Sequence, residues 1–509
     1  MWTGSSLVYR GSNASASANA SANTMTMDQA QAQDQPEAPP LAHGGQQEAP
    51  AIRLLAERLA VSKPELDEKP LLVPGEGEGN RKDSENSGKS PDAGLNTLNR
   101  RFYSSAQWTA DGTVILALSS DQTVSSFVLP ADLLQPAGEA RKLGCQASIK
   151  LPEPTQTLAA APYFSLANPA SQMFLVGCRD HPLHLYHAFP QPEPEDTTGA
   201  AAAAAAVASR TPLYTYKLIR HESEQYITPA SLLWEYPGTH FVCGSANRID
   251  LFDVSGHCSD GPTVTVPTIP SRRHIAKGSG VGMKGTVAAL ASSPPADANG
   301  HGSILAAGTW TRWMGTYDLH RSDRVVANWS IADADQKAFR ISLGGQGVVQ
   351  TAWSPCGRYL VVNERQADGL LVYDIRGTGQ LLAVLKGRRS TTQQRLHFDV
   401  FPAETGFEVW AGTQHGTVAV WEGVGMQNDA IDPSWTWKAH ESPVGSTIVH
   451  SSGSVAATCS GGWGYPREQD LDSASAGADP TLDGYNHHSR IFDESSIRIW
   501  SVGGQGVTA

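Results

Sequence analysis

Arginines that could bind phosphate gather in one short segment of the sequence. Arg388 and Arg389 are adjacent, and Arg395 ends the run Thr-Thr-Gln-Gln-Arg at 391–395. Guanidinium groups bind phosphate oxygens through charge and paired hydrogen bonds, so this cluster could hold a nucleic-acid backbone. Arg395 is the first candidate for a ligand contact, because it is expected on a loop entering a strand, where rigid scaffolds commonly carry function. The alternative, and the more common role, is an ion pair with a carboxylate of a neighbouring sheet.

A second group mixes aromatic rings with cations. Trp310 and Trp313 flank Arg312 in the run Thr-Trp-Thr-Arg-Trp-Met-Gly. RNA-binding surfaces stack unpaired bases on such rings, although tryptophans of a repeated β fold more often fill its core. Arg248 and Arg312 are weaker candidates, since each is expected near a strand or turn. Four other basic residues are expected on a solvated loop: Arg272, Arg273, His274 and Lys277.

Three closely spaced histidines raise the question of a metal site. In a strand, His184 points away from His181 and His187, because side chains alternate between the two faces. His181 and His187 then lie about 20 Å apart, too far to share one ion. We therefore expect no metal site and no cofactor. His440, in the run Lys-Ala-His-Glu at 438–441, resembles the histidine that WD-type repeats use to orient a turn by hydrogen bonding, which implies a structural task.

The sequence contains no catalytic constellation. The nucleophile motif G-x-S-x-G, the phosphate-binding motif G-x-x-x-x-G-K and the zinc motif H-E-x-x-H are all absent. The glycine-rich stretches at 278–282 and 344–347 lack the strand-then-helix setting that a nucleotide loop needs. We therefore expect a protein that is not an enzyme and takes no small-molecule substrate.

The elements that must position these residues recur from Arg101 onward. Each unit has an apolar strand, a turn, an alternating strand reaching small residues, a polar turn, and a strand ending in an aromatic residue. The unit is clearest at 106–128 and 351–375, and it recurs at 399–422. Such repetition predicts an all-β, seven-bladed WD40 β-propeller. Seven aromatic residues end these strands: Phe127, Tyr186, Phe252, Tyr317, Tyr373, Trp421 and Trp500.

The repeats are longer than a plain WD unit. Their aromatic residues lie 48 to 79 residues apart, whereas a plain unit has about 40–45 residues. Insertions at 191–210, 257–282 and 463–493 account for the excess. Each blade packs only on its neighbours, so such loops can lengthen without disturbing the ring. The propeller is predicted to span residues 98–509.

Residues 1–97 are rich in Ser, Ala, Asn, Gln, Pro and Gly, which predicts a largely disordered N-terminal region. The segment Ala51 to Leu59 is an exception, because its apolar residues recur at helical spacing. It could form a short amphipathic helix or dock a partner, and a frayed helix without a function is the equally weighted alternative. A propeller usually completes its last blade with a strand from the other terminus. That closing strand is expected between Leu71 and Arg100.

Composition and charge limit the class of protein. The chain is 40% hydrophobic with a net charge of −12, so any contact with RNA must come from a local basic patch. No stretch approaches about 18 apolar residues, and residues 1–10 lack the pattern of a signal peptide. Six scattered cysteines suit reduced, buried thiols in the cytosol or nucleus.

Several segments resemble the telomerase Cajal body protein 1 family of WD-repeat proteins. Residues 102–134 resemble its opening blade, 179–189 its second and 228–253 its third. Residues 391–399 resemble the Thr-Thr-x-Gln-Arg entrance to its sixth blade, and 412–421 match the strands that follow. The resemblance covers roughly residues 102 to 460 with interruptions. The chain departs from the family at an alanine-rich insertion, at His187 where the family has Asp, and at a long excursion in the last unit.

The resemblance implies a scaffold that binds small nuclear or Cajal-body RNA, such as telomerase RNA, and supports ribonucleoprotein assembly or localisation. It implies RNA and ribonucleoprotein proteins as partners, and no association with a membrane. It also implies a location in the nucleus, with the cytoplasm as a second location. It also extends to fungal relatives linked to spliceosomal small nuclear particles. The alternative hypothesis is a protein–protein adaptor in a spliceosomal or other nuclear complex that does not contact RNA.

Overall fold

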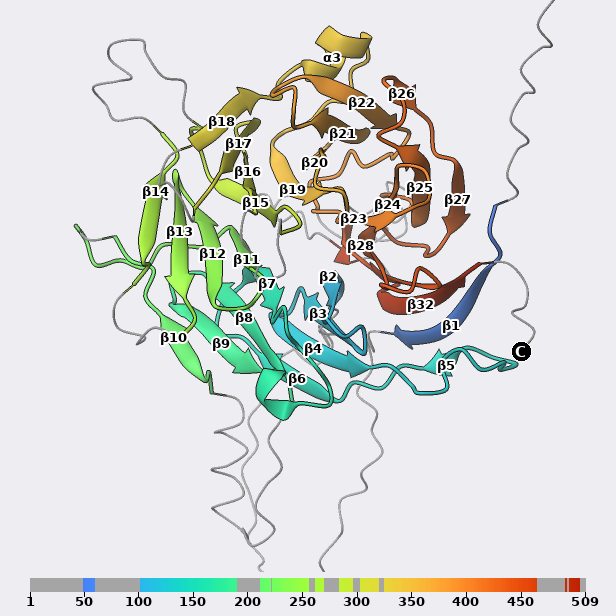
Figure 1. Ribbon diagram of the computed structural model, residues 1–509. Helices are drawn as coiled ribbons and strands as arrows, with labels where there is room; N and C mark the ends of the chain where they lie inside the picture. Colours follow the sequence, from blue (N-terminus) through green and yellow to red (C-terminus); the bar gives the residue numbers. More distant parts are fainter. Residues whose placement is uncertain are drawn as a thin grey trace, which may run out of the picture. The chain divides into compact units, whose positions relative to one another are not determined.

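The structure is a computed structural model in which short strands dominate (Figure 1). It describes residues 49–59, 101–189, 211–220, 222–255, 261–269, 283–295, 303–319, 325–464, 490–491 and 494–503.

Seven antiparallel sheets are arranged around a central axis, each with its first strand innermost (Figure 1). Blade 1 contains β2 (Tyr103–Trp108), β3 (Val114–Ser119), β4 (Thr123–Val128) and β6 (Ala147–Lys150). Blade 2 contains β7 (Thr155–Ala160), β8 (Met173–Cys178), β9 (Leu183–His187) and β10 (Tyr214–Tyr216). Blade 3 contains β11 (Ser231–Trp234), β12 (His240–Ser245), β13 (Arg248–Asp253) and β14 (Val264–Pro267). Blade 4 contains β15 (Val287–Ser292), β16 (Leu305–Thr309), β17 (Trp313–Tyr317) and β18 (Val325–Ser330). Blade 5 contains β19 (Val348–Trp353), β20 (Tyr359–Glu364), β21 (Gly369–Asp374) and β22 (Leu381–Lys386). Blade 6 contains β23 (Phe398–Pro402), β24 (Phe407–Gly412), β25 (Thr417–Val424) and β27 (Trp435–Lys438). Blade 7 contains β28 (Val444–Val449), β29 (Val455–Ser460), β32 (Ser496–Val502) and β1 (Ile52–Leu59).

Several short elements lie outside the four-stranded blades. The two-residue strands β5 (Arg141–Lys142) and β26 (Ala430–Ile431) add in parallel to β1 and β22, so they cover the outer edges of blades 7 and 5. The strands β30 (Trp463–Gly464) and β31 (Arg490–Ile491) pair with each other. A short helix, α3 (Ala334–Phe339), follows blade 4, and a 3-10 turn, η1 (Pro169–Ser171), follows β7. No helix in the described ranges is long and apolar enough to cross a membrane.

The predicted all-β, seven-bladed WD40 propeller is confirmed, and the seven aromatic residues mark it. Each aromatic residue lies in the third strand of its blade, and each is buried. The second and third strands have packed sheets on both sides, so their apolar residues run almost without interruption. All six residues of β3 are buried, for example.

Small residues at the ends of second strands let adjacent blades approach. A Cβ atom at Gly308 would lie 2.5 Å from Val348, and one at Gly412 would lie 2.5 Å from Val444. Both valines belong to the innermost strand of the next blade, β19 and β28 respectively. A larger side chain at either glycine would therefore push two blades apart.

The closing strand is β1, and two predictions about the N-terminal region were wrong. The strand was expected between Leu71 and Arg100, and Ala51 to Leu59 was expected to be helical. Instead, Ile52 to Leu59 pairs antiparallel with β32, with a bulge between Leu54 and Ala56. The bulge breaks the strict alternation of a strand and places Leu55 and Ala56 in the core, so the apolar spacing resembles that of a helix.

The other boundaries predicted from composition fall mainly outside the described residues. Apart from 49–59, the region predicted to be disordered, 1–97, lies outside them, and so does the whole insertion 191–210. The insertion predicted at 257–282 contains β14, the outer strand of blade 3, so composition placed its start too early. Within 463–493, only the pair β30 and β31 is described. Of the described cysteines, three are buried as expected, but Cys145 and Cys356 are exposed.

The propeller has two distinct faces. Antiparallel pairing reverses direction at every strand, so the turns of a blade alternate between the two ends. The turn between the second and third strands lies at the same end as the connection to the next blade. We call this end the connection face. The turns between the first and second strands, and between the third and fourth, form the opposite face.

Candidate functional site

The seven residues predicted to contact RNA all lie at the connection-face end of blades 3 to 6. Arg248 begins β13, Trp313 begins β17, and Trp310 and Arg312 lie in the turn between β16 and β17. The remaining three, Arg388, Arg389 and Arg395, lie in the connection between β22 and β23. Their surroundings differ. Some of these side chains are held in structural contacts within the propeller, and others reach its surface.

Arg312 forms a two-point ion pair with Glu364. Its Nε lies 2.7 Å from Oε1 and its Nη2 lies 3.0 Å from Oε2, and Nη2 also donates to the carbonyl oxygen of Gly344 at 3.1 Å. The Glu364 side chain is 3% exposed. Burial opposes the charge of Arg312, but the hydrogen bonds and charge of Glu364 outweigh it and raise the pKa of the guanidinium. The pair ties the β16–β17 turn to blade 5 and occupies Nε and Nη2 of Arg312.

Arg248 is also held by a carboxylate. Its Nε donates to Oδ2 of Asp250 at 2.8 Å, and its Nη2 contacts both Oδ1 of Asp250 and the hydroxyl of Thr265. Asp250 is fully buried. Arg248 therefore braces β13 against β14.

Arg388 is fully buried, but no acidic group in the described ranges faces it. Its guanidinium donates to the carbonyl oxygen of Gly412 at 3.1 Å, to Oδ1 of Asn363 at 2.5 Å and to the carbonyl oxygen of Leu396 at 2.6 Å. All three acceptors are neutral. Burial lowers the pKa of Arg388 to about 9. The side chain holds the connection between blades 5 and 6 and does not reach the surface.

Arg389 and Arg395 reach the surface from the same connection. Arg389 is exposed, and its backbone N–H donates to Oδ1 of Asp368 at 2.6 Å. Arg395 is partly exposed, yet its Nε and Nη2 atoms are buried without a hydrogen-bond acceptor among the described residues. The neighbouring Gln394 donates to the carbonyl oxygen of Gly461 in blade 7 at 2.7 Å. The connection thus reaches from blade 5 to blade 7 and holds Arg395 on a fixed backbone.

The two tryptophans have different roles. Trp313 packs against the core between blades 3 and 4. Trp310 is 42% exposed, and the guanidinium carbon of Arg365 lies 5.9 Å from the centre of its ring. Arg365 follows β20, and its Nε is buried without an acceptor in the described part of the chain. An exposed indole beside a cation is therefore present at the turn where the sequence predicted one, although the partner is Arg365 and not Arg312.

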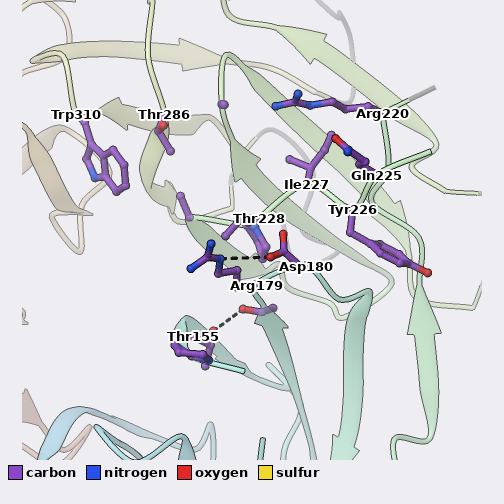
Figure 2. A pocket seen from close by; sticks show the side chains of 15 residues that line it. Thr155, Arg179, Asp180, Arg220, Gln225, Tyr226, Ile227, Thr228, Thr286 and Trp310 are labelled. Atoms are coloured by element: carbon purple, nitrogen blue, oxygen red, sulfur yellow. Dashed lines mark hydrogen bonds and ion pairs between the residues drawn. The ribbon is translucent and has the colours of Figure 1, made fainter. Parts of the chain in front are cut away.

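Trp310 also lines a hollow of about 540 Å³ on the connection face of blades 2 to 4. Figure 2 shows Trp310 and Thr286 on one side of the hollow, Arg220 and Tyr226 on the other, and Arg179 between them in this view. Arg179 pairs with the adjacent Asp180 at 3.3 Å, and both side chains are more than two-thirds exposed. Tyr226 is 37% exposed. The hollow therefore offers aromatic surface with guanidinium groups at its rim.

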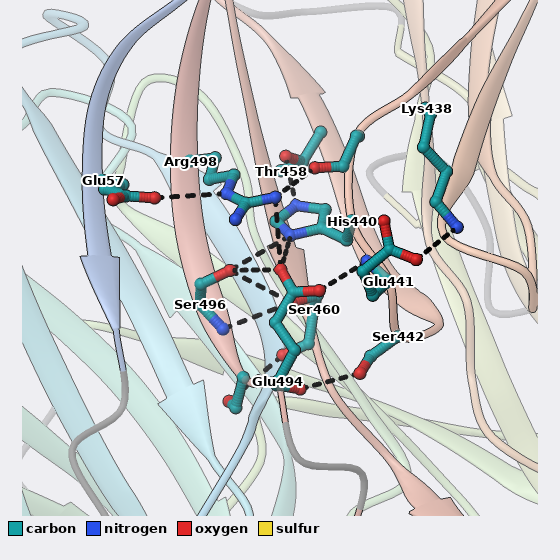
Figure 3. A network of polar contacts seen from close by, with 12 residues as sticks. Glu57, Lys438, His440, Glu441, Ser442, Thr458, Ser460, Glu494, Ser496 and Arg498 are labelled. Atoms are coloured by element: carbon teal, nitrogen blue, oxygen red, sulfur yellow. Dashed lines mark hydrogen bonds and ion pairs between the residues drawn. The ribbon is translucent and has the colours of Figure 1, made fainter. Parts of the chain in front are cut away.

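A polar network in blade 7 confirms the structural role predicted for His440 (Figure 3). The indole N–H of Trp500 donates to the Thr458 hydroxyl at 2.8 Å, and that hydroxyl lies 2.7 Å from Nε2 of His440. Nδ1 of His440 lies 3.1 Å from Oε1 of Glu494, which also faces Arg498 at 3.2 Å. Every polar group in this chain of contacts has a partner, so the network fixes the last blade.

Some residues of the connection face escaped the sequence analysis. Arg179, Arg220 and Arg365 are not part of any basic run, so a search for clustered cations passes over them. A usable signal existed for Arg179 and Arg365, because the repeat places the turn between the second and third strands of every blade on one face. The basic segment 272–277 lies outside the described residues.

Comparisons with known proteins find relatives that match most of the chain. No protein-family model matches the chain. It is 25% identical over 417 residues to telomerase Cajal body protein 1 of Bos taurus, covering 80% of this chain and 66% of that protein. The human protein of the same name is 25% identical over 420 residues, covering 81% and 65% respectively. Guanine nucleotide-binding protein negative regulator 1 of Schizosaccharomyces pombe is 26% identical over 331 residues, covering 63% of this chain and 70% of that protein.

The chain spans about two thirds of the length of these relatives. The similarity to telomerase Cajal body protein 1 covers most of this chain. The comparisons therefore confirm that this chain resembles the telomerase Cajal body protein 1 family, with a relative in fungi as well.

Proposed function

We propose that the chain is a non-enzymatic nuclear scaffold that binds small nuclear or Cajal-body-type RNA on its connection face and supports ribonucleoprotein assembly or localisation. The propeller fold and the names of its relatives support the coarser role of a scaffold or adaptor. The proposal of RNA as the ligand depends on one observation, the exposed ring of Trp310 beside Arg365 at the edge of a hollow.

This arrangement suits single-stranded RNA for a physical reason. Bases stack on exposed aromatic rings, and arginines nearby neutralise the backbone. The net charge of the chain is −12, so attraction to RNA has to be local. Arginines of several blades and connections on the connection face support this proposal: Arg220, Arg365, Arg389 and Arg395. Arg179 lies on the same face but pairs with Asp180.

The test begins with RNA that copurifies with the native protein after ultraviolet crosslinking and is then sequenced. Trp310→Ala is expected to weaken binding of the recovered RNA by about 1–3 kcal/mol, the usual contribution of one stacked base. Tyr214→Ala is the matched control, because Tyr214 is 53% exposed but lies on β10 at the outer edge of blade 2. Equal RNA affinity for both variants would contradict stacking on Trp310.

A protein–protein adaptor is the second candidate function. The name of the Schizosaccharomyces pombe relative refers to a guanine nucleotide-binding protein, which is a protein partner and not an RNA. If crosslinked material from native cells contains only protein, the adaptor role replaces the RNA-binding one.

A further inference from the structure

Three arginines come close together where the connection from blade 5 enters blade 6, and none of them has a carboxylate partner in the described part of the chain. Arg388 is satisfied by neutral oxygens only. Arg365 and Arg395 keep buried N–H groups without an acceptor: Nε of Arg365, and Nε and Nη2 of Arg395. Asn363 donates to the carbonyl oxygen of Leu396 at 2.8 Å, which holds the end of β20 against the connection that carries Arg395. Of the three arginines, Arg365 lies beside Trp310 on the connection face.

The arginines act on each other and on a nearby histidine. Burial and then the charge of Arg365 lower the pKa of Arg395 to about 10, and no carboxylate of the described residues offsets them. Burial and the charges of Arg395 and Arg388 lower the pKa of His397 to about 4, so His397 is neutral at pH 7. Among the described residues, no carboxylate faces Arg388 or the buried donors of Arg395.

A buried cation without a counter-ion is costly, so proteins normally provide a carboxylate. This propeller does so elsewhere, since Arg248 and Arg312 each face a buried acid. The unpaired donors of Arg395 and Arg365 therefore fit an acceptor that comes from a ligand. A phosphate group is well suited, because its oxygens accept several guanidinium hydrogen bonds at once and carry negative charge.

We propose that Arg395 and Arg365 form a phosphate site on the connection face, and that it holds a backbone phosphate of the RNA strand whose base stacks on Trp310. The identity of the phosphate as part of RNA depends on the function proposed above. The site itself does not, because inorganic phosphate offers the same oxygens.

The first experiment titrates the full chain with inorganic phosphate in a calorimeter. Arg395→Gln and Arg365→Gln are each expected to weaken phosphate binding by about tenfold or more, since each removes a charge-assisted hydrogen bond. Arg376→Gln is the control, because Arg376 is 60% exposed and lies in a turn of the opposite face. If the wild-type chain binds no phosphate, or if all three variants bind alike, the site is overturned.

Unfolding of the same variants separates a ligand site from architecture. Without phosphate, Arg395→Gln should leave the melting temperature unchanged or raise it, because it removes an uncompensated charge. Added phosphate should raise the melting temperature of the wild-type chain and not that of Arg395→Gln. A loss of stability in Arg395→Gln without phosphate would show that the arginine is structural and would overturn the site.

The second experiment measures RNA affinity at several salt concentrations. Arg395→Gln should reduce the slope of log affinity against log salt by about 0.7 for each RNA phosphate that the variant no longer neutralises. Phosphate binding without RNA binding would support the site but reject the proposed function. RNA binding that is unchanged in Arg395→Gln, with no binding of inorganic phosphate, would reject the site and leave the proposed function standing.

Discussion

Arginines with a facing carboxylate and arginines without one lie in different regions of the propeller. At the junction of blades 4 and 5, Arg312 meets both oxygens of Glu364, and in blade 7 Arg498 lies 3.2 Å from Glu494. At the entrance to blade 6, Arg388 and Arg395 have no acidic partner in the described residues. The difference shows that the type of residue does not reveal its role, whereas the presence or absence of a facing carboxylate does.

Removing Arg312 should have the largest effect on stability. Arg312→Met leaves the charge of Glu364, a side chain 3% exposed, without its partner. Breaking such a buried pair costs about 3–5 kcal/mol, measured as the free energy of unfolding in denaturant at neutral pH. Arg395→Met should show no such loss of stability. Equal losses in the two variants would remove the distinction between paired and unpaired arginines.

A double variant sharpens the same test. Replacing both partners, Arg312→Met with Glu364→Leu, removes the isolated charge as well as the ion pair. Apolar replacement of a buried pair is often close to neutral, so most of the stability should return. If the double variant is as unstable as Arg312→Met alone, the loss comes from packing and not from the charge of Glu364.

The next largest loss of stability is expected when acid protonates Glu494 in the blade 7 network. Burial would raise the pKa of Glu494, but hydrogen bonds from His440 and from the Glu441 N–H, together with the charge of Arg498, lower it from 4.5 to about 2. A lowered pKa stabilises the folded state above the unfolded value, and this contribution disappears as pH falls from about 4.5 towards 2. The contribution is about 3 kcal/mol, measurable as the decline in unfolding free energy with pH. Glu494→Gln should be less stable at pH 7 and should lack this part of the decline.

The smallest effect is expected where the network meets the closing strand. Glu57 of β1 lies 3.3 Å from Nε of Arg498, and its side chain is 34% exposed. Solvent screens such a pair, so Glu57→Gln should cost about 0–1 kcal/mol in denaturant unfolding. A loss as large as that of Arg312→Met would mean that closure of the ring depends on this one ion pair and not on the backbone ladder between β1 and β32.

The closing strand shows why local pattern was insufficient at the N-terminus. The segment Ile52 to Leu59 has helical spacing when considered alone, because the bulge at Leu55 disturbs its alternation. The open edge of β32 offers a row of hydrogen-bonding partners that a helix could not use. That edge lies at the far end of the chain, so no local window contains the information that selects a strand.

The candidate site was likewise predicted only in part from the sequence. The repeat located the turn that carries Trp310 and the connection that carries Arg395, and both lie on one face of the ring. The sequence did not distinguish Arg312, which faces Glu364, from Arg395, which faces no acid among the described residues. Charge pairing depends on which residues of adjacent blades meet, and that is set by packing.

The sequence by itself determined the number of blades, the third-strand aromatic residues and the hydrogen-bonding role of His440. These features follow from short-range order, since each repeat carries the same alternation of strand and turn. Only the tertiary structure decided which strand closes the ring, which arginines are neutralised, and that Arg365 and not Arg312 lies beside Trp310. Each of these depends on contacts between residues far apart in the chain, where burial and the facing charge fix the free energy of a side chain.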